Sequence, residues 1–347
     1  MKAKSIKGKS LQDIQKEIEE SIKDGFKPKL AIVFSSVIQD NESVSKILDK
    51  LGIIVFGVTT AGEFIDGDFG NESTAILLLE LDPSLFELYF EEFAEENTHD
   101  KAKNLAEQAL KRFNNPAFIV AGSGLRIDGE FIIRGIEDAA GADTTIYGAM
   151  AGDDLKMTDT FVFSNGKSSN RGIIMLAFDG DRIDFKGRAT SGVKGVGTLK
   201  TITKAEGWWI YTIDDQPALD LIARYMGVTL EKQDKVTVIP PEYTSTYPMI
   251  LHRSLGDPII RPVLLLNYET GSVMSNGLVE QGAKVQLSVP TDFEIINDVV
   301  DDCKNVRANE LPEAYAIIMF SCVGRLSALG PLISDEIEGV KKTIDVP

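Results

Sequence analysis

Residues 28–63, PKLAIVFSSVIQDNESVSKILDKLGIIVFGVTTAGE, contain two short apolar runs separated by a helical pattern. The runs are Leu30–Phe34 and Ile53–Val58. Between them, Val44–Leu51 has apolar residues at helical spacing and stops at Gly52, a residue typical of helix ends. Continuous apolar runs are typical of strands buried on both faces, and the intervening helix would cover the sheet. The stretch therefore predicts an α/β fold.

The same order of elements occurs a second time about 90 residues later, which indicates an internal repeat. The first copy, about residues 10–90, also includes a helix at Leu11–Asp24 and a strand at Ala75–Leu81. The second copy, residues 100–187, contains helices at Lys101–Phe113 and Phe131–Ala140 and strands at Ala117–Ala121, Thr144–Tyr147 and Ile173–Phe178. We expect layered sheets with covering helices, built from these tandem repeats.

The rest of the chain is richer in strand patterns, and a third, partial copy follows. Predicted strands are Ile183–Ser191, Thr198–Thr203, Trp208–Ile213, Val236–Ile239, Pro262–Asn267 and Lys284–Val289, with a helix at Pro217–Met226. The partial copy comprises a helix at Asp292–Arg307, a strand at Tyr315–Phe320 and a helix at Asp335–Lys342. The fold class is therefore α/β (mixed α+β) with a β-rich connecting region, and we predict domains at residues 1–215 and 216–347.

Charge and cysteine content exclude several classes of function. With 36 Lys+Arg against 53 Asp+Glu, the net charge of −17 argues against nucleic acid or an anionic membrane as partner. The N-terminus has no apolar stretch typical of a signal peptide, and no apolar run is long enough for a membrane helix. The two cysteines, Cys303 and Cys322, form no disulfide framework, so we expect a cytoplasmic protein.

Metal and cofactor motifs are absent from the sequence. The two histidines, His99 and His252, belong to no HxH or HExxH pattern, and there is no CxxC, so we expect no metal site. Two GKS tripeptides lack the preceding glycine of a phosphate-binding loop, since Ala3 and Phe161 occupy that position. We therefore expect no nucleotide cofactor.

The segment Gly57–Glu63 is the first candidate for ligand binding. Gly57 and Gly62 would allow close backbone approach, Thr59 and Thr60 offer hydroxyl groups, and Glu63 would pair with a ligand ammonium group. Such a loop suits a zwitterion. The alternative is a tight turn in which the threonines cap the backbone and the glutamate is solvated.

Further candidates lie at equivalent positions. Gly148 and Asp153 follow the corresponding strand of the second copy, with Asp153 in place of the first copy's glutamate. Ser35, Gly122 and Ser123 lie at the ends of predicted strands, where open α/β sheets bind ligands, although ordinary loop polarity also accounts for them.

Cys322 and Arg325 follow the third such strand. Arg325 would clamp a carboxylate through two hydrogen bonds. Cys322 would be either a ligand contact, a half-buried structural cysteine, or a nucleophile with a lowered pKa.

Motifs along most of the chain resemble those of the FIST family. They are Gly57–Glu63, Thr203–Gly207, Asp214–Asp220, Arg261-Pro262, Gly277–Gly282 and Phe320–Arg325, and the resemblance spans roughly residues 28 to 347. It divides the chain into a FIST N-like and a FIST C-like half. FIST proteins continue into a further strand with a Gly-Glu pair, so we expect a truncated C-terminal domain.

The resemblance implies a sensory protein that binds a small ligand, with amino acids among those proposed, and that is not an enzyme. FIST proteins pass their signal to histidine kinases, diguanylate cyclases or chemotaxis components, and we expect signalling in trans. Two alternatives are a thiol-dependent enzyme that uses Cys322 and an interaction scaffold that binds no ligand.

Overall fold

The computed structural model describes all residues except 93–96, 126, 228–234, 253–257 and 290–292. The described chain forms two compact units. The first unit comprises Met1–Arg188, Cys303–Phe320 and Ile337–Pro347, and the second comprises Ala189–Asp302 and Ser321–Glu336. The chain therefore returns to the first unit twice, at residues 303–320 and again at 337–347.

The first repeat forms one sheet, called sheet 1, with strand order β1-β6-β2-β3-β10-β11. Strands β2 and β3 are parallel, and β1 and β6 are antiparallel to their neighbours. The elements of this repeat are β1 (Lys2–Gly8), α1 (Leu11–Ile22), β2 (Leu30–Ser36), α2 (Asn41–Lys50), β3 (Ile54–Thr60), β4 (Glu63–Ile65), β5 (Asp68–Gly70) and β6 (Thr74–Glu80).

Local capping contacts begin the two helices of this repeat. The hydroxyl of Ser10 accepts a hydrogen bond from the amide of Asp13 at the start of α1, and the carboxylate of Asp40 accepts one from Ser43 at the start of α2. Gly52, with φ of +68°, follows α2 in a left-handed conformation that favours glycine.

The second repeat forms sheet 2, with strand order β7-β12-β8-β9. Its elements are β7 (Phe86–Glu92), α3 (Thr98–Arg112), β8 (Pro116–Gly122), α4 (Gly129–Ala140), β9 (Ile146–Met150), β10 (Val162–Ser164), β11 (Lys167–Ser169) and β12 (Gly172–Asp179). The hairpin β10–β11 departs from this sheet and extends sheet 1, where Val162 pairs with Val58 and Phe163 with Gly57.

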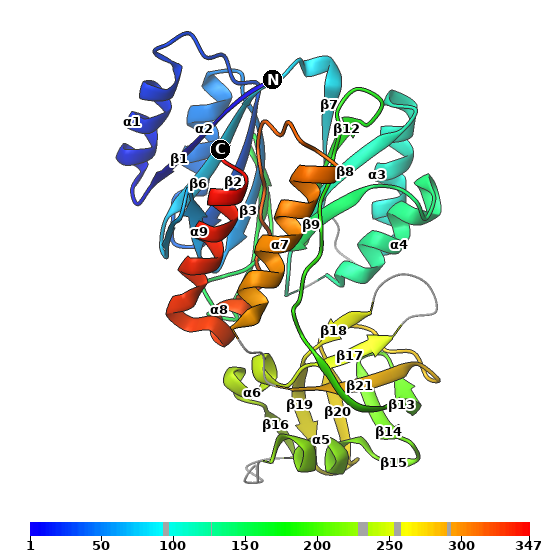
Figure 1. Ribbon diagram of the computed structural model, residues 1–347. Helices are drawn as coiled ribbons and strands as arrows, with labels where there is room; N and C mark the ends of the chain where they lie inside the picture. Colours follow the sequence, from blue (N-terminus) through cyan, green and yellow to red (C-terminus); the bar gives the residue numbers. More distant parts are fainter. Residues whose placement is uncertain (93–96, 126, 228–234, 253–257, 290–292) are drawn as a thin grey trace. The chain divides into compact units, whose positions relative to one another are not determined.

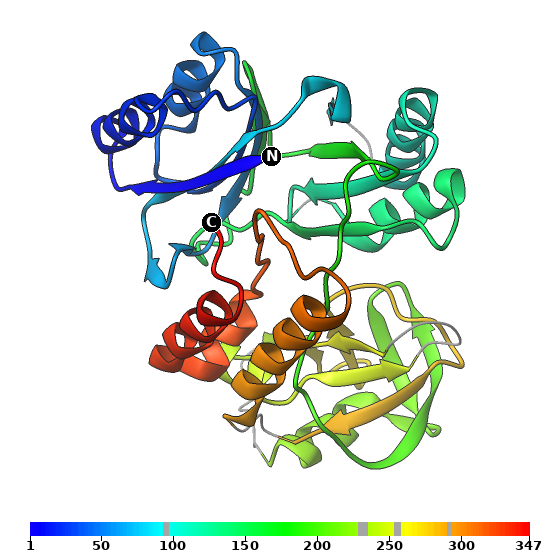
Figure 2. The same ribbon diagram turned by 45° about the horizontal axis from the view of Figure 1, so that its top comes forward.

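The first unit has four layers, α1 and α2, sheet 1, sheet 2, and α3 and α4 (Figures 1 and 2). Alternation along each strand creates the separate cores. On β2, Val33 packs against α1 and α2, whereas Ile32 faces sheet 2. On β8, Val120 packs with α3 and α4, whereas Ile119 faces sheet 1. Both faces of each sheet are buried, which explains the continuous apolar runs in the sequence.

The second unit is built on sheet 3, with strand order β16-β19-β20-β14-β13-β21-β17-β18 and β15 paired to β14. Its core includes Ile202, Ile210 and Val285, and the buried face of α5 packs on it through Ile222. The elements are β13 (Gly195–Glu206), β14 (Trp209–Ile213), β15 (Gln216–Pro217), α5 (Ala218–Met226), β16 (Val236–Val238), α6 (Pro241–Thr246), β17 (Met249–His252), β18 (Ile259–Arg261), β19 (Val263–Asn267), β20 (Ser272–Ser275), β21 (Lys284–Ser288) and α8 (Val323–Leu329). Helices α7 (Glu294–Asn309) and α9 (Ile333–Thr343) each contain residues of both units.

The predicted α/β fold class is confirmed, since 31% of the structure is helix and 34% is strand. Two predicted strands were wrong, because Ile183–Ser191 and Tyr315–Phe320 pair with no strand in the described chain. Both are extended segments whose apolar side chains pack against the core between sheets 1 and 2, as the edge-to-face contact of Phe320 with Phe34 illustrates. Burial accounts for their apolar composition without ladder pairing. The predicted helix Asp292–Arg307 begins outside the described residues and is observed as α7 from Glu294.

Candidate functional site

The carboxyl ends of the central strands β2 and β3 bring polar residues together. We call this border of the sheet, where the two strands end, the edge of sheet 1. The parallel register pairs Ser35 with Thr59 and Ser36 with Thr60. The loop after β9 crosses this edge, where the amide of Gly152 donates to the carbonyl of Thr59 at 2.7 Å. Residues from both repeats therefore meet at the edge where parallel strands tend to bind ligands.

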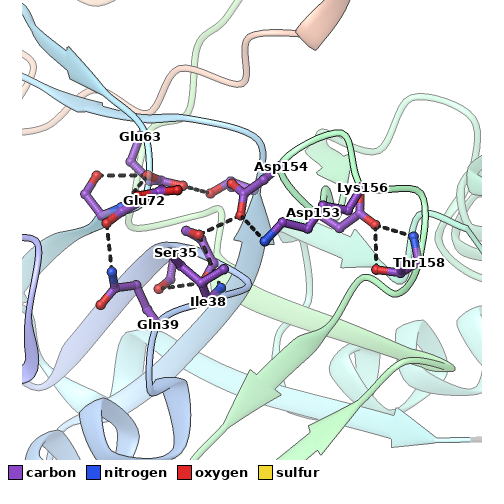
Figure 3. Close-up of polar contacts among 12 residues, drawn as sticks. Ser35, Ile38, Gln39, Glu63, Glu72, Asp153, Asp154, Lys156 and Thr158 are labelled. Carbon is purple, nitrogen blue, oxygen red and sulfur yellow. Dashed lines mark hydrogen bonds and ion pairs between the residues drawn. The ribbon is translucent and has the colours of Figure 1, made fainter.

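Glu63 is buried at this edge, with only 1% of its surface exposed. Its Oε1 accepts from the hydroxyl of Thr60 at 2.6 Å, and its Oε2 accepts from the amide and hydroxyl of Ser73 at 3.1 and 2.8 Å (Figure 3). Burial raises the pKa of Glu63, the three donors oppose that rise, and the charge of Asp154 adds to it. The side chain of Glu63 therefore links the residues before β4 to those after β5 through hydrogen bonds.

The loop after β9 supplies two adjacent carboxylates with different surroundings. Asp153, 3% exposed, accepts from the amide of Thr158 at 2.6 Å and so stabilises its own loop. The Oδ2 atom of Asp154 accepts from the hydroxyl of Ser36 at 2.6 Å and lies 3.9 Å from the ammonium of Lys156. The Oδ1 atom of Asp154 is buried and has no hydrogen-bond partner. Asp154, rather than the predicted Asp153, thus leaves an acceptor unused.

Helix α2 contributes two further polar side chains to the same edge. Asn41, the first residue of α2, donates through Nδ2 to the carbonyl of Ser36 at 3.4 Å. Its Oδ1 and the hydroxyl of Ser45, one turn later, are buried without a partner. Asn41, Ser45 and Asp154 were not among the predicted site residues. Two features of the sequence could have indicated these residues: the adjacent acidic pair Asp153–Asp154 and the polar residues at the start of α2.

Several predicted residues at this edge make contacts within the fold. The hydroxyl of Ser35 lies 2.7 Å from that of Thr74. Thr59 Oγ1 accepts from the amide of Phe161 at 2.8 Å. Gly62 adopts φ of +145° beside Phe69, a conformation that glycine tolerates. These contacts hold the loops in place around Glu63.

The predicted glycines away from this edge meet close packing. A Cβ atom on Gly57 would lie 2.2 Å from the ring of Phe163. Gly122 and Gly148 in sheet 2 would similarly meet Ile132 and the carbonyl of Val120. Ser123 directly follows β8, and its hydroxyl accepts from the amide of Gly172, the first residue of β12, at 3.1 Å. An added side chain at any of the three glycines would therefore disturb the packing of the sheets, and the hydroxyl of Ser123 contributes a hydrogen bond to sheet 2.

Cys322 and Arg325 belong to the second unit. Cys322 is an exposed free thiol immediately before α8. Arg325 donates through Nε to Oε1 of Glu336 at 3.0 Å and through Nη2 to its other carboxylate oxygen. Glu336 is fully buried. Arg325 therefore makes the predicted two-point clamp, but on a carboxylate of its own unit.

Family models match nearly the whole chain. The model of the FIST N domain matches residues 29–216, and that of the FIST C domain matches residues 218–347. The chain belongs to the FIST family. FIST domains are sensory rather than catalytic and generally bind small ligands in signalling. No curated protein matches this FIST chain.

Other features of this FIST protein limit the choice of site. Within the described residues, no three His, Cys, Asp or Glu side chains are grouped so as to hold a metal ion. None of the helices described is both long and apolar enough to span a membrane. A shallow surface hollow of about 350 Å³ is lined by Phe90, Glu92, Gly166, Lys167 and Ser168. It includes none of the predicted ligand-binding residues, so the edge of sheet 1 remains the candidate site of this FIST protein.

Proposed function

We propose that this protein is a sensor that binds a small metabolite at the edge of sheet 1 formed by the ends of β2 and β3. The ligand is an amino acid or a similar small molecule that carries an ammonium group. The partner that reads the bound state is a separate signalling protein, such as a histidine kinase, a diguanylate cyclase or a chemotaxis component.

One observation carries the choice of ligand. Two carboxylates, Glu63 and Asp154, lie close enough for the charge of one to raise the pKa of the other. The nearest cation in the described site, Lys156, is 3.9 Å from Asp154 and 46% exposed. Burying a carboxylate costs free energy unless an opposite charge lies beside it. The ammonium group of a ligand would offset the part of this cost that Lys156 does not.

The cysteines favour a cytoplasmic location for this sensor. Cys303 and Cys322 are both free, and Cys322 is exposed. Exposed free thiols persist in reducing compartments. We therefore place both the protein and its signalling partner in the cytoplasm.

The experiment is a thermal-shift screen against the amino acids and small amines, followed by calorimetry on any hit. A ligand at 100 times its Kd stabilises the folded state by about 2.7 kcal/mol, which raises Tm by several degrees. Glu63→Gln and Asp154→Asn should weaken binding of that ligand. The exposed Glu107, on α3, provides Glu107→Gln as a matched control that should bind normally. A screen in which no metabolite binds overturns the sensor proposal.

A further inference from the structure

Three buried polar atoms without a hydrogen-bond partner belong to two residues that contact Ser36 and to a third residue one helical turn away. They are Oδ1 of Asp154, Oδ1 of Asn41 and Oγ of Ser45. Buried polar groups in folded proteins are nearly always paired, so each exception requires an explanation, such as an absent ligand. Two of these atoms accept hydrogen bonds and donate none, and the serine hydroxyl accepts as well. The group that would satisfy them therefore carries several donors.

Ser36 contacts two of these three side chains. Its hydroxyl donates to Asp154 at 2.6 Å, and its carbonyl accepts from Asn41 at 3.4 Å. Ser45 is 3% exposed and lies one turn after Asn41 on the same face of α2. Side chains in a helix lean toward its N-terminus, so the hydroxyl of Ser45 is directed toward Asn41. Asp154 and Asn41 thus meet at Ser36, at the end of β2, and Ser45 adjoins Asn41 on α2.

The loop that carries Asp154 is held in an unfavourable backbone conformation. Asp154, Leu155 and Met157 have φ of 54°, 61° and 54°, a left-handed region that non-glycine residues seldom occupy. The amides of Lys156 and Thr158 donate to Asp153 at 3.0 and 2.6 Å and so keep the loop closed. Strained backbone of this kind clusters at ligand clamps and switch regions.

Lys156 lies within this loop and is the chain's own cation at the site. Its ammonium is 3.9 Å from Oδ2 of Asp154, too far for a direct hydrogen bond, and Oδ1 of Asp154 remains unpaired (Figure 3). The lysine therefore supplies charge without supplying the missing donors. A small cation with several N–H groups would supply both.

We propose that Asp154, Asn41 and Ser45 bind the primary ammonium or guanidinium group of the ligand, and that Lys156 is the competing cation that this group displaces. The inference rests on the proposed sensor function and specifies the chemistry of its site. Recognition depends on N–H donors and not on positive charge alone. The ligand requires no carboxylate for this contact, so simple amines also bind.

The test compares ethylammonium chloride with tetramethylammonium chloride at equal ionic strength, measured by calorimetry on the full chain. Both cations carry one positive charge, but only ethylammonium has N–H donors. Ethylammonium should bind and tetramethylammonium should not. Lys156→Gln should bind ethylammonium several-fold more tightly because the internal competitor is gone, whereas Lys167→Gln, which alters an exposed lysine on β11, should bind like the wild type.

Variants of the acceptors separate this inference from the sensor proposal. Asn41→Ala should weaken ethylammonium binding about tenfold or more, as expected for a hydrogen bond to a charged group, and Asp154→Asn should abolish it. Circular dichroism at the working temperature establishes that each variant is folded. Equal affinity for both cations, or unchanged affinity in Asn41→Ala and Asp154→Asn, overturns the inference. An amino acid that binds Asn41→Ala and Lys156→Gln as tightly as the wild type, and binds Glu63→Gln more weakly, would leave the sensor proposal standing without this inference.

Discussion

The ring of Phe163 covers Gly57 so closely that a Cβ atom on Gly57 would lie 2.2 Å from a ring atom. The two residues are directly paired across β3 and β10, and they belong to different repeats. The glycine therefore allows the hairpin of the second repeat to close onto the sheet of the first. Its role in the structure is close packing.

We predict that Gly57→Ala lowers the free energy of unfolding by about 1–3 kcal/mol, because the added methyl group forces the Phe163 ring to move. Phe163→Ala should cost about 3–5 kcal/mol through the cavity it leaves. The double variant should lose less than the sum, because removal of the ring also removes the clash. Urea unfolding measures all three. Strictly additive losses would contradict the contact.

We predict that Glu63 makes the protein less stable as pH rises. Burial raises the pKa of Glu63 above its ordinary value of 4.5, so the folded state holds this proton at pH values where the unfolded state has released it. Its contribution to stability is therefore greatest below pH 4.5 and falls as pH rises through the folded-state pKa.

Urea unfolding of the wild type and Glu63→Gln from pH 4.5 to 7.5 measures this effect. The stability of the wild type relative to Glu63→Gln should decrease with pH. Glu80 is the matched control, because the amide of Lys27 lowers the pKa of its carboxyl group below 4.5. The corresponding difference for Glu80→Gln, measured from below pH 4.5 upward, should increase with pH and level off above the unfolded value of 4.5. An increase for both variants would show that the Glu63 carboxylate is stabilised on folding.

We predict a second pH effect at His99, whose ring nitrogens lie 3.0 Å from carboxylates of Asp100 and Asp138. The hydrogen bond with Asp100 is the main cause that raises the pKa of His99, Asp138 adds to it, and burial opposes it. Because the folded-state pKa is raised, the stabilisation is complete below the unfolded value of 6.5 and is lost as pH rises through the folded value.

Proton NMR titration of His99 measures this pKa directly. Asp138→Asn should lower the pKa of His99. Because His99 and Asp138 are partly exposed, Asp138→Asn should lower the free energy of unfolding by about 0.2–1 kcal/mol at pH 6. This difference should vanish at high pH. A His99 titration that is identical in Asp138→Asn would exclude the second contact.

We predict that Arg325 supports the fold of the second unit through Glu336. Removal of one partner from a buried ion pair leaves an uncompensated charge, so Arg325→Met should cost about 3–5 kcal/mol. Arg325→Met combined with Glu336→Met should recover much of that loss. Chemical unfolding followed by circular dichroism measures both. If Arg325→Met folds with wild-type stability, Arg325 is available to bind a ligand carboxylate.

Local patterns predicted most of the fold. Helices α1 and α3 and strands β2, β6 and β12 lie close to their predicted positions, because apolar periodicity and terminal residues act within a few residues of one another. Strand β1, KAKSIKG, was missed. It is the outermost strand of sheet 1, where polar side chains remain exposed and no continuous apolar run is required.

The candidate site was predicted less completely than the fold. Glu63 was a predicted site residue and lies at the edge of sheet 1, but its contacts with Ser73 depend on how the β4–β5 hairpin closes. Asp153 and Asp154 are adjacent and chemically equivalent in the sequence. Only the path of their loop decides that one accepts from Thr158 and the other from Ser36.

The α/β class, the repeated order of helices and strands, and the polar ends of β2 and β3 could all be predicted from the sequence, because they follow from burial patterns along short segments. Tertiary structure alone decided that Asp154 of the second repeat meets Ser36 of the first, and that Asn41 lies beside them. Their separation in sequence, 118 residues for the first pair, means that no local pattern carries this information. The meeting results from the pairing of β10 with β3, which joins the two repeats at one edge of the sheet.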